Sequence, residues 1–144
     1  MLIGEYKHTL DPKKRLSVPS KWRKDLGRVL IVTRGLDNCL FVYPQKEWKK
    51  ITEKVSQLPL GQADTRGFTR FFLSGAVEVE VDNVGRILVP DFLKDFAGLD
   101  SKVVLAGIYD RVEIWAENKW EEYTQKIENQ ADQIAEKLGE IGVL

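Results

Sequence analysis

Apolar residues along this chain occur mostly in short runs separated by charged and turn-forming residues. Residues 77–81 are Val-Glu-Val-Glu-Val, an alternation with the period of two that is typical of a half-buried strand. Further runs rich in β-branched and aromatic residues lie at 29–32, 40–43, 103–105 and 112–115. The pattern predicts a domain built largely from short strands.

Three longer segments carry apolar residues at helical spacing, at 45–58, 65–73 and 117–138. The first two flank the turn-forming residues 59–61, so we expect them to form a helical hairpin. The third has an apolar stripe along its length, and such a stripe needs cover. Either the rest of its own chain or a neighbouring subunit can supply that cover.

Two stretches of the chain resemble each other. Residues 10–19 are Leu-Asp-Pro-Lys-Lys-Arg-Leu-Ser-Val-Pro, and residues 81–90 are Val-Asp-Asn-Val-Gly-Arg-Ile-Leu-Val-Pro, with Asp, Arg and Pro in register. After one inserted residue the correspondence continues, with Gly35 opposite Gly107 and the same apolar alternation beyond it. Agreement of the motif and of the later pattern indicates two copies of one structural unit.

Each copy contains an Asp-x-x-x-Arg turn, at 11–15 and at 82–86. The aspartate that opens each turn can accept hydrogen bonds from nearby backbone amides and so position the turn. The fourth residue is Gly85 in the second copy, which adopts a positive φ without steric penalty, but Lys14 in the first. This difference predicts two turns of different shape.

A proline and a short helical segment follow each turn. The segments are 21–26 and 92–96, and the residues directly before them are Ser20 and Asp91. Because serine and aspartate are favoured N-cap residues, we expect these two to cap the short helices.

Charge is divided unevenly between the halves of the chain. The total is neutral, with 22 basic and 22 acidic side chains among 144 residues. Residues 1–72 nevertheless carry a net charge of +8 and residues 73–144 a net charge of −8. Such asymmetry favours nucleic-acid binding or electrostatic self-association.

The composition, with 43% hydrophobic residues, is that of a folded protein, and several classes of function are disfavoured. No apolar run approaches the roughly 20 residues of a membrane span, and no secretory signal is evident, so we expect a cytoplasmic protein. A lone cysteine and a lone histidine form no metal-binding cluster. We therefore expect no membrane partner, no metal and no cofactor.

The residue types permit two catalytic arrangements, and both are disfavoured. Cys39 could pair with His8, but Cys39 lies in an apolar run and is expected in the core. Asp11 and Asp82 could act as paired carboxylates, but each has an arginine four residues later, which favours an ion pair or a turn cap. With no catalytic signature present, we expect neither an enzyme nor a small-molecule substrate.

Basic residues gather around the first turn. Eight cations and only two acids lie between Lys7 and Arg28, and Lys13, Lys14 and Arg15 are consecutive. An exposed turn of this kind can contact DNA phosphates and, through its guanidinium, guanine edges. The alternative is an ordinary solvated turn. The second turn has only Arg86, so the first is expected to dominate binding.

A single basic turn binds DNA weakly, because each contact releases few counterions. Useful affinity follows when a symmetric assembly repeats the contact on repeated DNA sites. The opposite charges of the two halves suit a head-to-tail contact between subunits that closes into a ring.

The strand–Asp-x-x-Gly-Arg–strand–proline unit resembles the SpoVT-AbrB DNA-binding module, and two such units in a chain of this length resemble the MraZ family. Stretches 4–11, 33–40 and 68–76 share the resemblance, which covers essentially the whole chain. It implies an α+β fold: a duplicated swapped-hairpin, AbrB-like β-barrel with flanking helices and a pseudo-twofold axis within one chain. One departure is Lys14, which stands where the family has glycine.

We expect one compact domain with four parts. The parts are a first repeat at 1–50, a helical connection at 51–75, a second repeat at 76–120 and a C-terminal helix at 121–144.

The resemblance also implies a function. Members of the family bind repeated elements of double-stranded promoter DNA as a homo-oligomeric ring, and usually repress their own division and cell-wall gene cluster. A nucleoid-associated location follows from that role. We expect DNA contacts from Lys7, Lys13, Lys14, Arg15 and Arg86, with Asp11, Asp82 and Gly85 positioning the turns. The alternative is a non-enzymatic structural or interaction module that uses its basic turn on an acidic protein partner.

Overall fold

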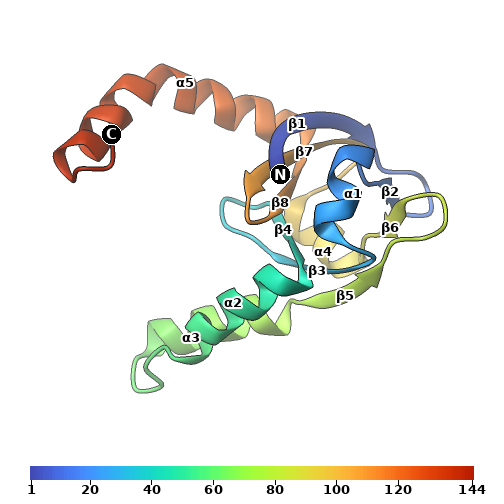
Figure 1. Ribbon diagram of the computed structural model, residues 1–144, viewed down its shortest axis with the longest axis horizontal. Coiled ribbons are helices and arrows are strands. Elements are labelled where there is room, and N and C mark those ends of the chain that lie inside the picture. Colours follow the sequence, from blue (N-terminus) through green and yellow to red (C-terminus); the bar gives the residue numbers. More distant parts are fainter.

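The computed structural model describes all residues from 1 to 144 and contains eight strands and five helices (Figure 1). The strands are β1 (Leu2–Thr9), β2 (Arg15–Ser17), β3 (Val29–Arg34), β4 (Leu40–Pro44), β5 (Val77–Glu80), β6 (Arg86–Leu88), β7 (Lys102–Tyr109) and β8 (Val112–Ala116). The helices are α1 (Ser20–Leu26), α2 (Gln45–Ser56), α3 (Ala63–Ser74), α4 (Asp91–Ala97) and α5 (Glu117–Glu140). The element order β2-α1-β3-β4-α2 recurs as β6-α4-β7-β8-α5, which confirms the duplication.

The strands form a six-stranded antiparallel sheet, in the order β1-β7-β8-β4-β3-β5, and a two-stranded ribbon of β2 and β6. The sheet is symmetric about the pairing of β4 with β8. Its outer strands are exchanged, because β1 belongs to the first copy yet pairs with β7 of the second, and β5 belongs to the second copy yet pairs with β3 of the first. The predicted fold class, with strands swapped between two copies, is confirmed.

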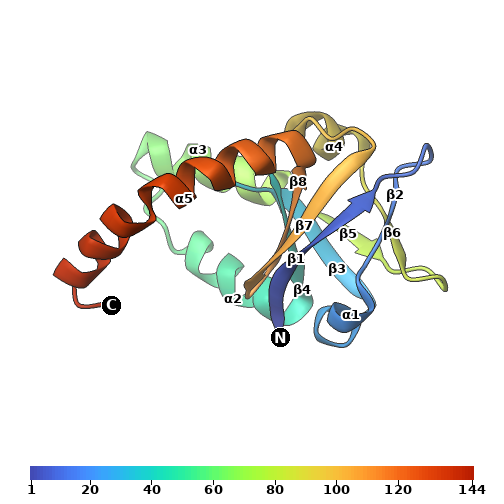
Figure 2. The ribbon, with the colours of Figure 1, turned by 90° about the horizontal axis from the view of Figure 1, so that it is seen from above.

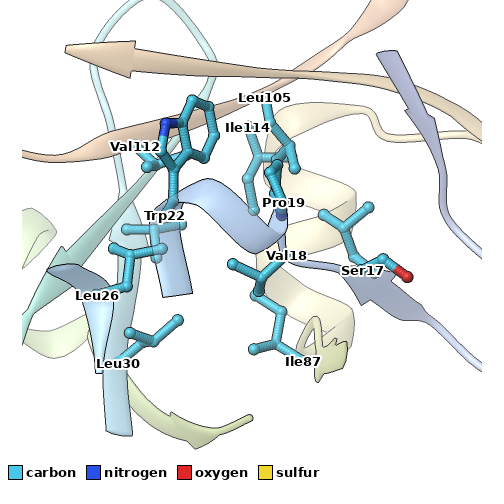
Figure 3. A pocket seen from close by; sticks show the side chains of 12 residues that line it. Ser17, Val18, Pro19, Trp22, Leu26, Leu30, Ile87, Leu105, Val112 and Ile114 are labelled. Carbon is cyan, nitrogen blue, oxygen red and sulfur yellow. The ribbon is translucent and has the colours of Figure 1, made fainter. Parts of the chain in front are cut away.

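One hydrophobic core lies between the sheet and the ribbon. It contains Leu16 and Ile87 from the ribbon together with Trp22, Leu93 and their neighbours from both copies. Figure 3 shows side chains of both copies around a cavity of about 10 Å³, which is at the lower limit of the space that one water molecule needs. Because both copies supply this core, the amphipathic strands of either copy alone would leave their inner faces uncovered.

A second, mainly aromatic cluster covers the other face of the sheet. It joins Cys39 and Trp115 to side chains of the helices that follow β4 and β8. The rings of Trp48 on α2 and Phe72 on α3 lie 5.4 Å apart, as expected for a helical hairpin. Cys39 is fully buried here, so its predicted core position is confirmed.

The short helices begin differently from the prediction. Pro19 and Pro90 occupy the N-cap positions of α1 and α4, in extended backbone, and no side chain caps either helix. Ser20 and Asp91 are instead the first helical residues, one position too late for their side chains to cap. The predicted N-cap roles of Ser20 and Asp91 are therefore wrong.

Helix α5 extends away from the body of the molecule, on the side opposite the β2–β6 ribbon (Figures 1 and 2). None of its residues is buried, and Ile134 in its apolar stripe is 36% exposed. The chain therefore does not itself cover the outer half of the stripe. None of the helices is both long enough and apolar enough to span a membrane.

Candidate nucleic-acid interface

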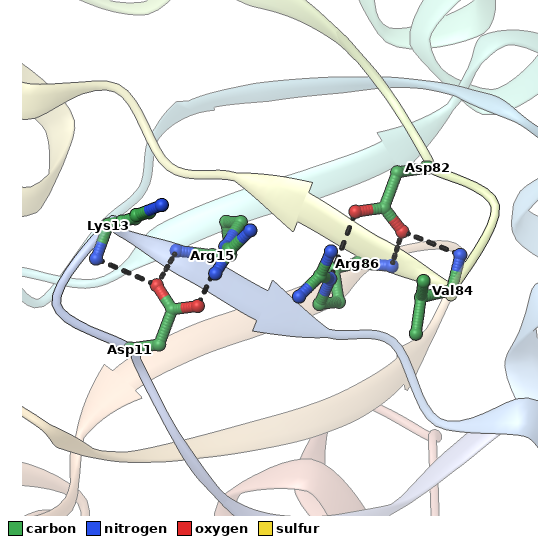
Figure 4. A network of polar contacts seen from close by, with 6 residues as sticks. All are labelled: Asp11, Lys13, Arg15, Asp82, Val84 and Arg86. Atoms are coloured by element: carbon green, nitrogen blue, oxygen red, sulfur yellow. Dashed lines mark hydrogen bonds and ion pairs between the residues drawn. The ribbon is translucent and has the colours of Figure 1, made fainter.

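The two Asp-x-x-x-Arg turns lie at opposite ends of the β2–β6 ribbon (Figure 4). The antiparallel register places Leu16 opposite Ile87, and hydrogen bonds continue the pairing beyond both strands. The Val18 N–H donates to the Gly85 carbonyl at 2.8 Å, and the Val89 N–H donates to the Lys14 carbonyl at 2.8 Å. Each strand thus supports the turn of the other copy, and the two turns are fixed relative to each other.

In the first turn, the Asp11 carboxylate organises the backbone. Its Oδ1 accepts hydrogen bonds from the backbone N–H groups of Lys13 at 2.9 Å and Arg15 at 2.8 Å. Its Oδ2 accepts one from Nε of Arg15 at 2.7 Å. The carboxylate therefore holds both the backbone of the turn and the Arg15 guanidinium.

The second turn repeats this arrangement. Oδ1 of Asp82 accepts from the backbone N–H groups of Val84 and Arg86, both at 2.9 Å, and Oδ2 accepts from Nε of Arg86 at 2.9 Å. In both turns only Nε of the arginine is engaged, so the two terminal nitrogens of each guanidinium have no protein partner. Those nitrogens can donate to a phosphate or to the acceptor pair of a guanine.

These contacts stabilise the ionised carboxylates. The pKa of Asp11 lies below its ordinary value, chiefly because the backbone N–H of Arg15 donates to it, with the Arg15 side chain adding to the effect. The pKa of Asp82 is lowered in the same way by the backbone N–H of Arg86. Each turn therefore keeps its aspartate–arginine ion pair at neutral pH.

The two turns have the same shape, contrary to the prediction from Lys14. The backbone of Lys14 has a φ of 63° and that of Gly85 a φ of 85°, both in the left-handed region. A non-glycine residue there is disfavoured by about 1 kcal/mol, a penalty that the hydrogen bonds to Asp11 can outweigh. Nζ of Lys14 forms an ion pair with Asp91 at the start of α4.

Each turn also contacts a helix of the other copy. Arg23 on α1 lies over the second turn, where a Cβ added to Gly85 would be 2.2 Å from the guanidinium carbon. The position of Arg23 was not predicted, because it depends on the packing of α1 against a turn far away in sequence. The only sequence signal is that glycine, and no larger residue, stands at 85.

The structure brings together Lys13, Lys14, Arg15 and Arg86 on the ribbon. Lys7, the fifth residue expected to contact DNA, lies on β1 outside both turns, with its Nζ 3.8 Å from Oε1 of Glu121 on α5. Lys13 is exposed, and its ammonium has no protein partner.

A strand-swapped, duplicated sheet with a paired Asp-x-x-x-Arg ribbon defines a single-chain, pseudo-twofold protein of the predicted AbrB-like fold class. A family model described as "MraZ protein, putative antitoxin-like" matches the chain twice, over residues 1–71 and 72–140. The chain belongs to the MraZ family.

Similar proteins cover nearly the full chain. The "Transcriptional regulator MraZ" of Natranaerobius thermophilus is 52% identical over 96% of both chains. Proteins with the same name from Caldanaerobacter subterraneus subsp. tengcongensis and Moorella thermoacetica are each 49% identical. The first of these two matches covers 99% of this chain and 100% of the relative, and the second covers 96% of both.

Proposed function

We propose that this protein is a transcriptional regulator that binds repeated elements of double-stranded promoter DNA through its two Asp-x-x-x-Arg turns. The observation that carries the proposal is the ribbon, which holds two arginines with unpartnered terminal nitrogens in a twofold arrangement. DNA-binding dimers use twofold symmetry in this way, because it matches the symmetry of paired half-sites. The name of the similar proteins supports the same conclusion.

The turn residues have separate roles in this proposal. Arg15 and Arg86 reach base edges, since a guanidinium held by its Nε still offers two parallel donors. Lys13 contacts phosphate, while Asp11 and Asp82 hold the arginines in place. Lys14 contributes less, because its ammonium is already paired with Asp91.

The regulator acts in the cytoplasm, at the nucleoid, and represses its own division and cell-wall gene cluster. Membership of the MraZ family supports this role. A protein bound to repeated promoter elements competes directly with the transcription machinery for the same DNA.

The functional form is a homo-oligomeric ring. Support comes from the uncovered apolar stripe of α5 and from the net charges of +8 and −8 on the two halves of the chain. A projecting acidic helix suits a basic surface of the next subunit, and such head-to-tail contacts close into rings. Light scattering at moderate salt is expected to give the mass of several chains, and a monomeric mass would contradict this part of the proposal.

Substitution of Arg15 tests the proposal directly. The Arg15→Ala variant should bind promoter repeats with an affinity lower by about 1–3 kcal/mol and should lose preference at the base that Arg15 contacts. Arg70→Ala is a matched control, because Arg70 is an exposed arginine on α3, away from the ribbon. Equal affinities for the two variants in a gel-shift titration would remove Arg15 from the interface.

The second candidate is an interaction module whose basic turn binds an acidic protein. The exposed cations of the ribbon suit such a partner as well. A DNA-binding protein should show log affinity falling linearly with log salt on a selected repeat and clear preference over a scrambled duplex. Weak binding that is blind to sequence would favour the interaction module.

A further inference from the structure

The second turn is completed by a cation from another part of the chain. Arg23 of α1 donates from its Nε to the carbonyl of Val18 at 3.0 Å, at the end of β2. Its guanidinium lies against Gly85, which is buried although its neighbours Asn83 and Val84 are exposed. The side chain that covers the second turn is therefore an arginine from the first copy.

The first turn has the reverse arrangement of charges. There the cation is Lys14 of the turn itself, and the helix of the other copy supplies a carboxylate, Asp91, that pairs with it. In the second turn the corresponding residues are Gly85 and Ser20, so the turn has no side chain at that position and the helix has no acid there. The cation comes from the helix instead.

Arg23 has no counterion within the chain. No carboxylate lies within 4.0 Å of its guanidinium, whereas Arg15, Arg86 and Arg111 all form ion pairs. Only its Nε is engaged, so its terminal nitrogens are unpartnered. A guanidinium that donates only one hydrogen bond and lacks a counterion still has free N–H donors and an unpaired positive charge, and these can bind an anion.

We propose that Arg23 is a DNA-binding residue of the second turn and that its ligand is a backbone phosphate beside the base read by Arg86. The inference rests on the proposed function. The motif alone predicts that the first turn dominates DNA binding. With Arg23 included, the second turn presents two cations to DNA, Arg23 and Arg86. The first turn presents Lys13 and Arg15, and its Lys14 is held in an exposed ion pair with Asp91. The two turns should therefore contribute comparable affinity.

A binding experiment with matched variants of α1 tests the proposal. The probe is the duplex that the wild-type protein selects from a random pool, titrated over a series of salt concentrations. Arg23→Gln is compared with Lys24→Gln, which removes the same charge from an exposed neighbour on the same helix. Arg23→Gln should weaken binding on the order of tenfold at 0.15 M salt and reduce the log–log salt slope by about 0.9, and Lys24→Gln should change neither appreciably.

A third variant separates charge from structure. Arg23→Lys keeps the charge but removes the Nε bond to Val18, so it should restore the salt slope while thermal unfolding reports any loss of stability. If Arg23→Gln behaves like Lys24→Gln, or if Arg23→Lys fails to restore the slope, the proposal is overturned. Arg15→Gln is run beside them: failure of wild-type binding, or no effect of Arg15→Gln, contradicts the proposed function and not this assignment.

Discussion

Lys14 shows how a single residue can depart from a motif without changing the shape that the motif encodes. Its left-handed backbone is held by the hydrogen bonds that its neighbours Lys13 and Arg15 donate to Asp11, and the neighbours of Gly85 donate the equivalent bonds to Asp82. Intrinsic preference therefore predicts the wrong shape for the first turn, because it omits the contribution of Asp11. The surroundings of a residue decide between conformations whose energies differ by only about 1 kcal/mol.

Replacement of Lys14 by glycine should leave the protein equally stable or more stable, by up to about 1 kcal/mol, because it removes backbone strain and loses only an exposed ion pair. Lys14→Val should be destabilising, since a β-branched residue fits a positive φ poorly. Urea unfolding of both variants measures the difference. A glycine variant less stable than the wild type would mean that the pair with Asp91 outweighs the strain.

The ionised Asp11 makes the first turn sensitive to acid. Its pKa in the folded chain lies below the ordinary value of 3.8. A carboxyl group with a lowered folded pKa contributes stability that is fully present above its unfolded pKa and is lost as the pH falls through the folded pKa. A carboxyl carbon NMR titration should therefore give midpoints below 3.8 for Asp11 and Asp82, and normal midpoints would show that the turn hydrogen bonds do not persist in solution.

At the scale of elements, the spacing of apolar residues predicts the helices and strands whose formation depends on their own sequence. The helices expected at 45–58 and 117–138 are observed as Gln45–Ser56 and Glu117–Glu140, because an apolar stripe at helical spacing is itself the cause of their packing. Strand β1 gives no such signal, since its apolar residues do not alternate cleanly and most of its side chains are exposed. Its backbone pairing with β7, which lies far along the chain, makes it a strand.

Helix α3 is fixed to the sheet by side chains that reach its last turn. The fully buried Thr33 of β3 donates from Oγ1 to the carbonyl of Phe72 at 2.6 Å, and Arg34 donates from Nη1 to the carbonyl of Phe71 at 2.9 Å. These carbonyls belong to the helix end, where no intrahelical donor is available. The two residues therefore act as a C-terminal cap supplied by a neighbouring strand.

Thr33→Val should lower the free energy of unfolding by about 1–2 kcal/mol, because it keeps the shape of the side chain but leaves the buried Phe72 carbonyl without its donor. Thr52→Val on α2 is the matched control. The Thr52 hydroxyl donates only to the Lys49 carbonyl, which also belongs to α2, and this hydrogen bond is exposed to solvent. Chemical denaturation of both variants should separate them, and an equal effect would show that the Thr33 bond does not anchor α3.

At the scale of the whole molecule, the apolar stripe of α5 and the charge division belong together. If a second copy covers the stripe, Ile134→Glu should lower the assembled mass in light scattering without changing the melting of the body, because Ile134 contacts no core. Gln133→Glu adds the same charge at an exposed neighbouring position and should leave the mass unchanged. Equal masses for the two variants would place the subunit contact elsewhere.

The arrangement of the two copies is the part of the fold that periodicity cannot supply. Alternation predicts strands but not their partners, so the exchange of β1 and β5 between copies is implied only by the resemblance to a family. The same holds for Arg23, whose neighbour Gly85 belongs to the other copy. The strands and long helices of each copy are therefore predictable from the apolar pattern, whereas the pairing that joins the two copies is not.

The exchanged strands also determine when this protein can fold during its synthesis. The first strand made, β1, must wait for β7, because its last residue Thr9 pairs with Lys102. At usual translation rates that delay is about 5 to 20 seconds, during which β1 remains an unpaired edge on the nascent chain. Native contacts so distant in sequence also slow folding after release, so most of the assembly of this small protein takes place after its synthesis is nearly complete.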